Sequence, residues 1–303
     1  MSENLKLFKK LPPVISILIT GLFFLYCNAY GQSFHERVSE KDGAVQVWVP
    51  PGSFVMGIDD PEMPYERAER PPHPVTITNG FWMDKFEVTN EQYALFLNRY
   101  MEKEKVTGYS DMFKRAFGRV DLNHRLCGIM LDEAGKEFSA KPGWENIPVM
   151  PVNWTGAREY AETMGKRLPT EAQWEYAARG PENFMYPWGN QWDPDRANVN
   201  TQKPVPAGSK HKDISPFGVM DMAGNVREWV YDRWQPDFYS RSPEKDPVNP
   251  AGAWEWIPRA IRGGGFAFTE WDSRTTSRGN RAYAYFPVGT GFRCIETGEP
   301  PEK

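Results

Sequence analysis

The stretch MPVNWTGAREYAETMGKRLPTEAQWEYAARG, residues 150–180, contains two amphipathic patterns that each carry a start and a stop signal. Asn153 and Thr170 precede the two patterns, and both residue types accept hydrogen bonds from the free backbone amides of a helix start. A glutamine three residues after Thr170 completes a capping-box sequence. Gly165 and Gly180 follow the patterns, where glycine typically ends a helix. The stretch therefore predicts two short helices joined by a turn.

The residues upstream predict strands and a further helix. Residues 45–57, VQVWVPPGSFVMG, alternate and then break at Pro-Pro-Gly, as a strand followed by a turn does. In PVTITNGFWMDKFEVTN two β-rich runs flank Asn79-Gly80, the dipeptide favoured in type I′ turns, so we expect a β-hairpin there. Thr89 and Gln92 form a second capping box, which predicts a helix in NEQYALFLNRY.

The rest of the chain indicates one loop-rich domain. Residues 101–147 are charged and weakly periodic, and we interpret them as an elaboration of the same domain because the core pattern resumes directly afterwards. Twelve Trp, 26 Gly and 27 Pro describe a chain in which aromatic rings fill the space between irregular segments. We find no internal repeat and no linker, so residues 32–303 are expected to form a single domain.

Composition and charge exclude one class of partner. The 303 residues are 40% hydrophobic and 25% charged, which is typical of a globular protein. The net charge is −4, and no run of Lys or Arg occurs after residue 10. A nucleic-acid partner is therefore not expected.

The N-terminus has the pattern of a signal peptide. Three lysines among the first ten residues precede the apolar run VISILITGLFFLYC, and Ala29 and Gly31 have the small side chains that signal peptidase requires. We expect residues 1–31 to be a signal peptide removed before Gln32. The mature chain would then be periplasmic or secreted, with no membrane span.

Two alternatives for the N-terminus are less favoured. The apolar run approaches the lower limit of a membrane span, so it would allow an uncleaved anchor. A lipoprotein is disfavoured because the bulky Tyr26 precedes Cys27. Export would place the remaining cysteines, Cys127 and Cys294, where a disulfide is permitted, and their spacing leaves pairing open.

The usual catalytic and metal motifs are missing. The sequence has no glycine-rich phosphate loop, no His-Glu-x-x-His helix and no Cys-x-x-Cys pair, and its four histidines are isolated. In DMAGNVREW, Asp221 and Glu228 bracket a Gly-Asn turn, and carboxylates with backbone carbonyls suit Ca²⁺. The alternative is that these carboxylates pair with arginines.

The segment IRGGGFAFTEWDSRTTSRGNR, residues 261–281, is too polar for a core strand and too specific for a linker. Its arginines, and one that follows, could line an anionic pocket through bidentate contacts. They could instead brace loops by ion pairs and carbonyl contacts, which we favour in a chain with few helices and strands. These residues are Arg274, Arg278, Arg281 and Arg293.

Taken together, the segments resemble the formylglycine-generating enzyme family, also called the sulfatase-modifying factor family. The matching phrases are GSFVMG, PPHPVTITNGFWMDKFEVTNEQYALF, MPVNWTGAREYAETMGKRLPTEAQWEYAARG, YPWGN, FGVMDMAGNVREW, IRGGGF and GTGFRC. They occur in family order over residues 45–295 and leave mainly residues 101–147 unmatched. The resemblance implies the family's variant of the C-type lectin fold, an α+β fold with little regular secondary structure.

The resemblance also implies where chemistry should be found. Family enzymes oxidise a sulfatase cysteine to formylglycine with O₂ and a copper ion held by two cysteines. Those positions fall here on Phe268 and Ser273, neither of which can supply the thiolate that holds Cu(I). We therefore expect a family member that lacks the cysteine pair and does not use copper.

The resemblance implies one calcium site and part of another. The complete site falls on Asp221, Glu228 and the carbonyl groups of Gly224 and Val226. For the other site the chain offers only Asn198 and Val199.

The resemblance also bears on the cysteines. Cys294 occupies a position that is structural where the family has cysteine. Its usual partner position falls on Tyr160-Ala161, so a bridge would have to recruit Cys127.

Three functions from different classes remain. The first is an exported binding or assembly module that presents the family's cleft to a protein or small-molecule ligand. The second is an oxidoreductase with a different active site, in which Glu270 acts as acid or base, although a solvated loop carboxylate is the simpler interpretation. The third is a diversified lectin-fold binding protein. Asn280 is the only Asn between Arg262 and Arg293, which argues against such diversification.

Overall fold

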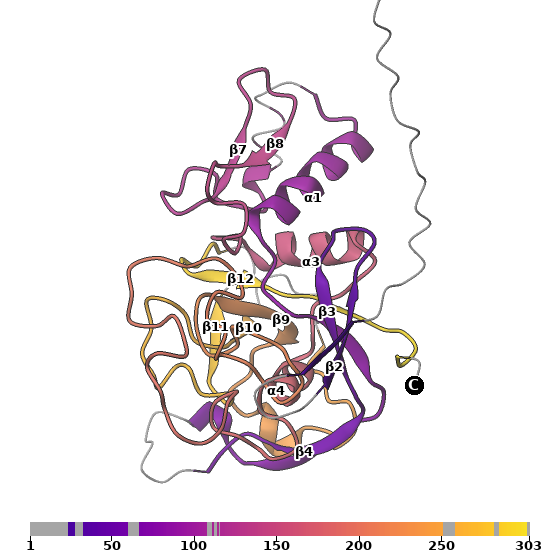
Figure 1. Ribbon diagram of the computed structural model, residues 1–303, viewed down its shortest axis with the longest axis vertical. Coiled ribbons are helices and arrows are strands. Elements are labelled where there is room, and N and C mark those ends of the chain that lie inside the picture. The colour runs from indigo at the N-terminus through magenta and orange to yellow at the C-terminus, as the bar shows by residue number, and fades with distance from the viewer. Residues whose placement is uncertain are drawn as a thin grey trace, which may run out of the picture.

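The computed structural model describes residues 24–27, 33–59, 67–107, 111, 114, 116–250, 258–281 and 285–301. Within these residues the chain forms two larger sheets, two strand pairs and short helices (Figure 1). The first sheet has the order β1 (Phe24–Cys27), β2 (Ser33–Val38), β3 (Val45–Val49), β6 (Phe81–Asp84) and β13 (Ile295–Glu296). The second has the order β11 (Arg278–Arg281), β10 (Arg259–Arg262), β9 (Arg227–Arg233) and β12 (Thr290–Phe292).

The strand pairs and helices lie around these sheets. β4 (Gly52–Met56) pairs with β5 (His73–Ile77), and β7 (Ile129–Leu131) pairs with β8 (Phe138–Ala140). The helices are α1 (Asn90–Lys103), α3 (Trp154–Thr163) and α4 (Glu171–Arg179), with 3₁₀ turns η1 (Arg67–Glu69) and η2 (Phe238–Arg241). All pairings in the larger sheets are antiparallel except β9 with β12. The result is the loop-rich α+β architecture predicted from the sequence.

The three predicted helices are confirmed, together with their start signals. The Thr89 and Thr170 side chains each accept the backbone N–H of the third helical residue, in complete capping boxes. Asn153 caps α3 by accepting the Gly156 N–H at 2.8 Å. Each helix starts directly after a residue whose side chain accepts a backbone N–H that the helix itself leaves without a partner.

The predicted hairpin at Asn79-Gly80 is wrong. β5 pairs with β4, and β6 pairs with β3 and β13, so the dipeptide joins strands of different sheets. Neither residue has a positive φ. A Cβ on Gly80 would overlap the Trp48 ring and lie 2.8 Å from its Cη2. The glycine is therefore needed for close approach of an indole and not for a tight turn.

The core consists mainly of two apolar clusters. One surrounds α1 and α3 and includes the fully buried Trp229. The other surrounds α4 and joins Trp174 with residues of both larger sheets and of the β4–β5 pair. Aromatic rings supply much of this packing, as expected for a chain with little regular structure.

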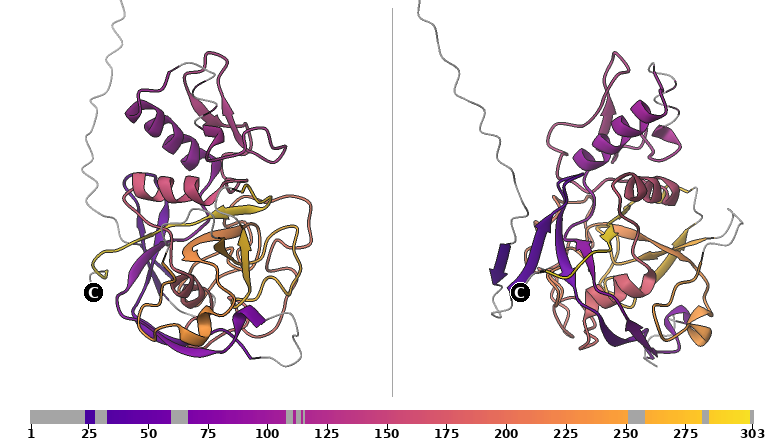
Figure 2. Two further views of the ribbon diagram at one scale, coloured as in Figure 1. Left: turned by 180° about the vertical axis from the view of Figure 1, so that it is seen from behind. Right: turned by 90° about the vertical axis from the view of Figure 1, so that its right-hand side faces the viewer.

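Residues 101–147 extend the domain at one end. Figure 2 shows α1 and the β7–β8 hairpin standing together, beyond α3, in both views. Asn98 on α1 bonds the backbone of Phe138 in both directions, at 2.8 and 2.7 Å. The hairpin thus packs on α1, and the domain boundaries stay a prediction.

The predicted signal peptide lies largely outside the described residues. Its described part, β1, is the edge strand of the first sheet and pairs with β2. Cleavage before Gln32 would remove β1 and make β2 the edge strand. Across the described part of the chain, the helices are all too short or too polar to cross a membrane.

Candidate functional site

The three glycines Gly263–Gly265 allow an unusually close approach of neighbouring groups. A Cβ on Gly264 would overlap the Ala223 carbonyl oxygen and lie 2.7 Å from Ser273 Oγ. A Cβ on Gly265 would lie 3.1 Å from the Phe268 ring and 3.4 Å from the Arg227 side chain. The glycines thus let the loop that follows β10 fold back tightly, which brings Phe268 over Arg227 with 4.9 Å between the guanidinium carbon and the ring centroid.

The two positions that hold copper in the family do not fit a copper ion here. Phe268 offers an aromatic ring without a donor atom. Ser273 is buried, and its hydroxyl donates to the Thr269 carbonyl at 3.1 Å. Cu(I) prefers soft thiolate ligands, which neither residue supplies.

Two of the chain's three cysteines, Cys127 and Cys294, are in the core. Cys127 and Cys294 are both buried and both free, so the disulfide left open by the sequence is not formed. The Cys127 thiol lies 3.9 Å from the Ile129 carbonyl oxygen, and Cys294 follows β12, where its N–H donates to Asp84. Burial raises the pKa of both thiols, which disfavours the thiolate form.

Glu270 has the surroundings of a solvated loop residue. It is exposed, and no hydrogen bond or ion pair joins its carboxylate to the described residues. Its backbone carbonyl accepts the Ser273 N–H at 3.1 Å. This placement favours the simpler interpretation over a positioned acid or base.

Three of the four singled-out arginines brace the structure, as the sequence analysis favoured. Each is paired with a buried carboxylate: Arg274 with Glu69 at 3.2 Å, Arg278 with Glu171 at 2.6 Å, and Arg293 with Glu228 at 2.7 Å. Arg281 is exposed and donates only to its own neighbour's carbonyl within the described chain.

Arg227 was missed by the sequence analysis. It is only 7% exposed, yet it forms no ion pair with any described carboxylate. Its Nε donates to the Gly263 carbonyl at 3.2 Å, and burial lowers its pKa to about 10. In VREW the arginine stands directly before a glutamate and resembles a surface residue, so the sequence offered no signal of burial.

The loop assigned to calcium brings Asp221 and Glu228 into one buried region. Glu228 accepts two bonds from Arg293, at 2.8 and 2.7 Å, and one from Trp174 Nε1 at 2.8 Å. For Glu228 the arginine-pairing alternative is therefore realised. Asp221 accepts the Gly208 N–H at 2.5 Å and adopts a φ of 61° at the turn.

Two further carboxyl groups lie beside Asp221. Both oxygens of Glu87 and one oxygen of Asp213 are buried without a hydrogen-bond donor among the described residues. Burial, then the nearby Asp221 charge, raises the pKa of both groups well above the usual range. Burial also raises the pKa of Asp221 to about 6. Arg293 alone cannot balance these carboxyl groups and Glu228, so protons or a cation must do so.

Calcium fits this region in donor chemistry, because a hard cation takes carboxylate and carbonyl oxygens. In the described residues no three acidic, His or Cys side chains are already arranged to hold a metal ion. Glu228 would have to share its oxygens with Arg293. At the partial second site, Asn198 is engaged in bracing, since it donates to Asn225 and Lys203 and accepts from Thr201, while Val199 lies beside it in the loop.

A cavity beside two tryptophans, here called the aromatic cavity, lies in the segment to which the loop of residues 263–277 is hydrogen-bonded. Trp188 lies 5.5 Å from Tyr186 and 5.7 Å from Trp192, measured between ring centroids. A cavity of about 500 Å³ is lined by residues 188–194 and Arg196. Thr275 joins this segment to the loop through bonds to the carbonyls of Phe184 and Met185, at 2.7 and 2.9 Å.

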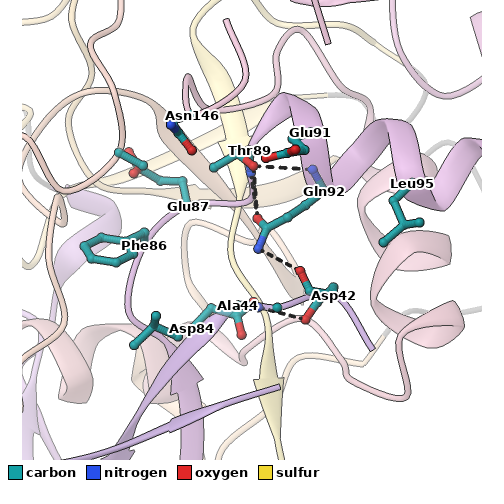
Figure 3. Close-up of a pocket in the computed structure, with 13 residues that line it drawn as sticks. Asp42, Ala44, Asp84, Phe86, Glu87, Thr89, Glu91, Gln92, Leu95 and Asn146 are labelled. Carbon is teal, nitrogen blue, oxygen red and sulfur yellow. Dashed lines mark hydrogen bonds between the residues drawn. The ribbon is translucent and has the colours of Figure 1, made fainter. Parts of the chain in front are cut away.

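A second cavity, of about 570 Å³, lies between α1 and the first sheet (Figure 3). Its acids Asp42 and Asp84 are paired with the buried Lys166 at 2.7 and 2.9 Å. Gln92 bridges the Thr89 N–H and the Asp42 carbonyl. Asp42, Asp84 and Gln92 thus satisfy one another on this side of the cavity, which favours bracing there. Glu87 also lines the cavity, and its oxygens belong to the unsatisfied acids beside Asp221.

The fold and these positions define a class of protein, and comparisons with known proteins agree. The model of the sulfatase-modifying factor enzyme 1-like domain matches residues 32–297. The inactive C-alpha-formylglycine-generating enzyme 2 of Bos taurus is 31% identical over 284 residues, covering 84% of this chain and 89% of that protein. The chain therefore belongs to the sulfatase-modifying factor family, whose members include the formylglycine-generating enzymes, and has that family's lectin-like α+β fold.

Two further relatives show the range of proteins that carry this domain. PvdO from Pseudomonas aeruginosa has a similar solved structure, with a TM-score of 0.64 and 26% identity over 86% of this chain and 97% of that one. Serine/threonine-protein kinase Pkn1 of Chlamydia trachomatis is 34% identical over 251 residues, or 82% of this chain. The chain spans only about 35 to 38% of the length of the Pkn1 proteins that it matches.

Proposed function

We propose that this chain is an exported family member that binds a ligand and does not oxidise sulfatase cysteines. The observation that carries the proposal is the pair Phe268 and Ser273 at the family's copper positions. Without thiolates there, the route by which the family activates O₂ is closed. Cys127 and Cys294 are buried in the core and cannot replace them.

The ligand surface that we propose is the loop 263–277 with the aromatic cavity beside it. Trp188 and Trp192 are half-buried, and Trp271 on the loop is 55% exposed. Rings that keep an exposed face beside a hydrogen-bonded loop suit recognition of a protein segment or a small molecule. The inactive relative from Bos taurus supports a role without oxidase activity, because its name states inactivity for that protein.

Export and calcium binding complete the proposal. Export follows from the charged, apolar and small-residue pattern at the N-terminus. A structural Ca²⁺ would bind Asp221, the carbonyls of Gly224 and Val226, and Glu228. The unsatisfied oxygens of nearby buried acids support a cation there, because a cation would offset their desolvation.

The test is an assay for formylglycine. The full chain, loaded with copper, is incubated in air with a peptide that carries a sulfatase-type cysteine, and the peptide is followed by mass spectrometry. An active formylglycine-generating enzyme serves as the positive control. We expect no aldehyde product from this chain, and conversion of the peptide would refute the proposal.

A further inference from the structure

We propose that Arg227 anchors a binding site for an oxyanion, namely a carboxylate, sulfate or phosphate group of the ligand. The site lies under Phe268, at the position where the family's chemistry would take place. This inference rests on the proposed function, because it names the chemical class that the binding surface would recognise.

The first support is that Arg227 lacks a carboxylate partner, whereas three other buried arginines have one. Arg262, Arg274 and Arg293 each have a carboxylate oxygen within 3.2 Å. Arg227 is buried but for 7% of its surface, and no described carboxylate lies within ion-pair distance of it. A buried guanidinium without a counter-charge is costly unless a ligand or water satisfies it.

The nearby charges do not neutralise Arg227. Asp272 is the acid that favours its charged form, but one oxygen of this carboxylate already accepts the Thr269 N–H at 3.2 Å and hydroxyl at 3.1 Å. Arg281 opposes the charged form of Arg227 and has no described carboxylate partner either. The balance of charge at this point is therefore positive.

The second support is the geometry of the guanidinium group. A Cβ on Gly279 would overlap Arg227 Nη2 and lie 2.8 Å from Cζ, so the glycine makes room for the group. The Phe268 ring stacks over it at 4.9 Å. Nε is used by the Gly263 carbonyl, while Nη1 and Nη2 bond no described residue. Neither Nη atom is among the buried, unbonded polar atoms, so both keep contact with solvent.

This arrangement suits an oxyanion. Gly279 and Phe268 fix the plane of the guanidinium, and its two Nη groups remain available as parallel donors. Two parallel N–H donors match the spacing of two oxygens in a carboxylate, sulfate or phosphate group. The exposed Arg281 would add attraction for the same anion.

The experiment titrates the full chain with sodium succinate, sulfate and phosphate, separately, by calorimetry at constant ionic strength set with NaCl. We expect saturable binding of at least one anion at a single site, and the strongest binder identifies the group. Arg227→Lys should weaken binding about tenfold, because a point charge replaces the two-donor fork. Gly279→Ala should weaken it similarly, because the added Cβ displaces the guanidinium without changing its charge.

Arg259→Lys is the matched control. Arg259 is also buried, lacks a described ion pair and stacks on an aromatic ring, with its guanidinium carbon 3.8 Å from the Trp154 centroid. This variant should keep the wild-type affinity. Circular dichroism checks that each variant folds. If Arg227→Lys does not fold, the exposed Arg281→Gln serves as the variant that should weaken anion binding.

Failure of the wild-type chain to bind any of the three anions would overturn the inference. Undiminished binding by the folded Gly279→Ala and Arg281→Gln variants would also do so, as would loss of binding in Arg259→Lys alone. None of these results bears on formylglycine production. Failure of this inference is thus distinguishable from failure of the proposed function.

Discussion

Single residues decide the chemistry of this chain. Phe268 and Ser273 were assigned to the copper positions from the sequence, and the structure shows the ring stacked on Arg227 and the hydroxyl bound to a carbonyl. The bracing roles of three arginines followed from the expectation that a loop-rich domain needs ion pairs. Arg227 was not predictable, because whether a charged residue in a strand faces the interior depends on tertiary packing.

The pairing of Glu228 shows the same limit. The sequence placed two carboxylates around a turn but could not choose between a cation and an arginine. Arg293, 65 residues further along the chain, binds Glu228. Glu87 and Asp213 lie near Asp221 only in the folded chain, so no local sequence pattern could predict that these acids cluster.

Asp232 leads to a prediction about pH. Burial, then the charge of Glu171, raises its pKa to about 7, although its oxygens accept the Asn249 and Glu171 N–H groups at 2.7 and 2.8 Å. The folded state thus holds a proton that the unfolded state releases near pH 4. Stability should fall as the pH rises from about 4 to about 7, by up to about 1.4 kcal/mol per pH unit for one proton.

Urea unfolding of the wild type and of Asp232→Asn between pH 5 and 8.5 measures this effect. The variant should be less stable at low pH, since its amide cannot accept both N–H groups, and its stability should depend less on pH. Parallel pH curves for the two proteins would contradict the assigned protonation.

At the scale of elements, local signals worked where the stabilising contact is local. The helix starts at Thr89, Asn153 and Thr170 were predictable because each cap bonds an amide within three residues. The hairpin at Asn79-Gly80 was not, because β5 and β6 belong to different sheets. Thr78 bonds Asp246 instead, a residue far along the chain.

Gly80 provides a test of this corrected role. Gly80→Ala should destabilise the fold by about 1–3 kcal/mol, because the new methyl group would overlap the Trp48 ring. Gly298→Ala is the matched control, since its Cβ would lie 3.5 Å from Trp82 in ordinary contact. Chemical denaturation measures both variants, and equal stability of the two would contradict the packing account.

For the whole molecule, the resemblance to a known family predicted the fold, which the periodicity of the sequence alone could not. Seven ordered phrases identified the family and its loop-rich α+β fold, and the family match over residues 32–297 bears this out. Strand order was not readable, because the sheets join segments such as β6 and β13 that are more than 200 residues apart. The elaboration at residues 101–147 matched no family phrase, and its hairpin emerged only from the structure.

The calcium proposal makes a prediction at this scale. A bound Ca²⁺ stabilises only the folded chain, so a chelator should lower the melting temperature and added Ca²⁺ should restore it. Asp221→Ala should abolish this dependence, whereas Glu270→Ala, which alters an exposed carboxylate, should keep it. If neither chelator nor Ca²⁺ changes the melting temperature, the calcium proposal is contradicted, and the buried acids are neutralised by protons.

The central claim is that the family's metal position has become a site without thiolates. The most direct measurement is a Cu(I) titration in which the protein competes with a chromophoric Cu(I) chelator. The wild-type chain should withdraw no Cu(I), and Phe268→Cys/Ser273→Cys should withdraw about one equivalent, because two thiolates are then available. One tightly bound Cu(I) per wild-type chain, retained when Cys127 and Cys294 are replaced by alanine, would contradict the account.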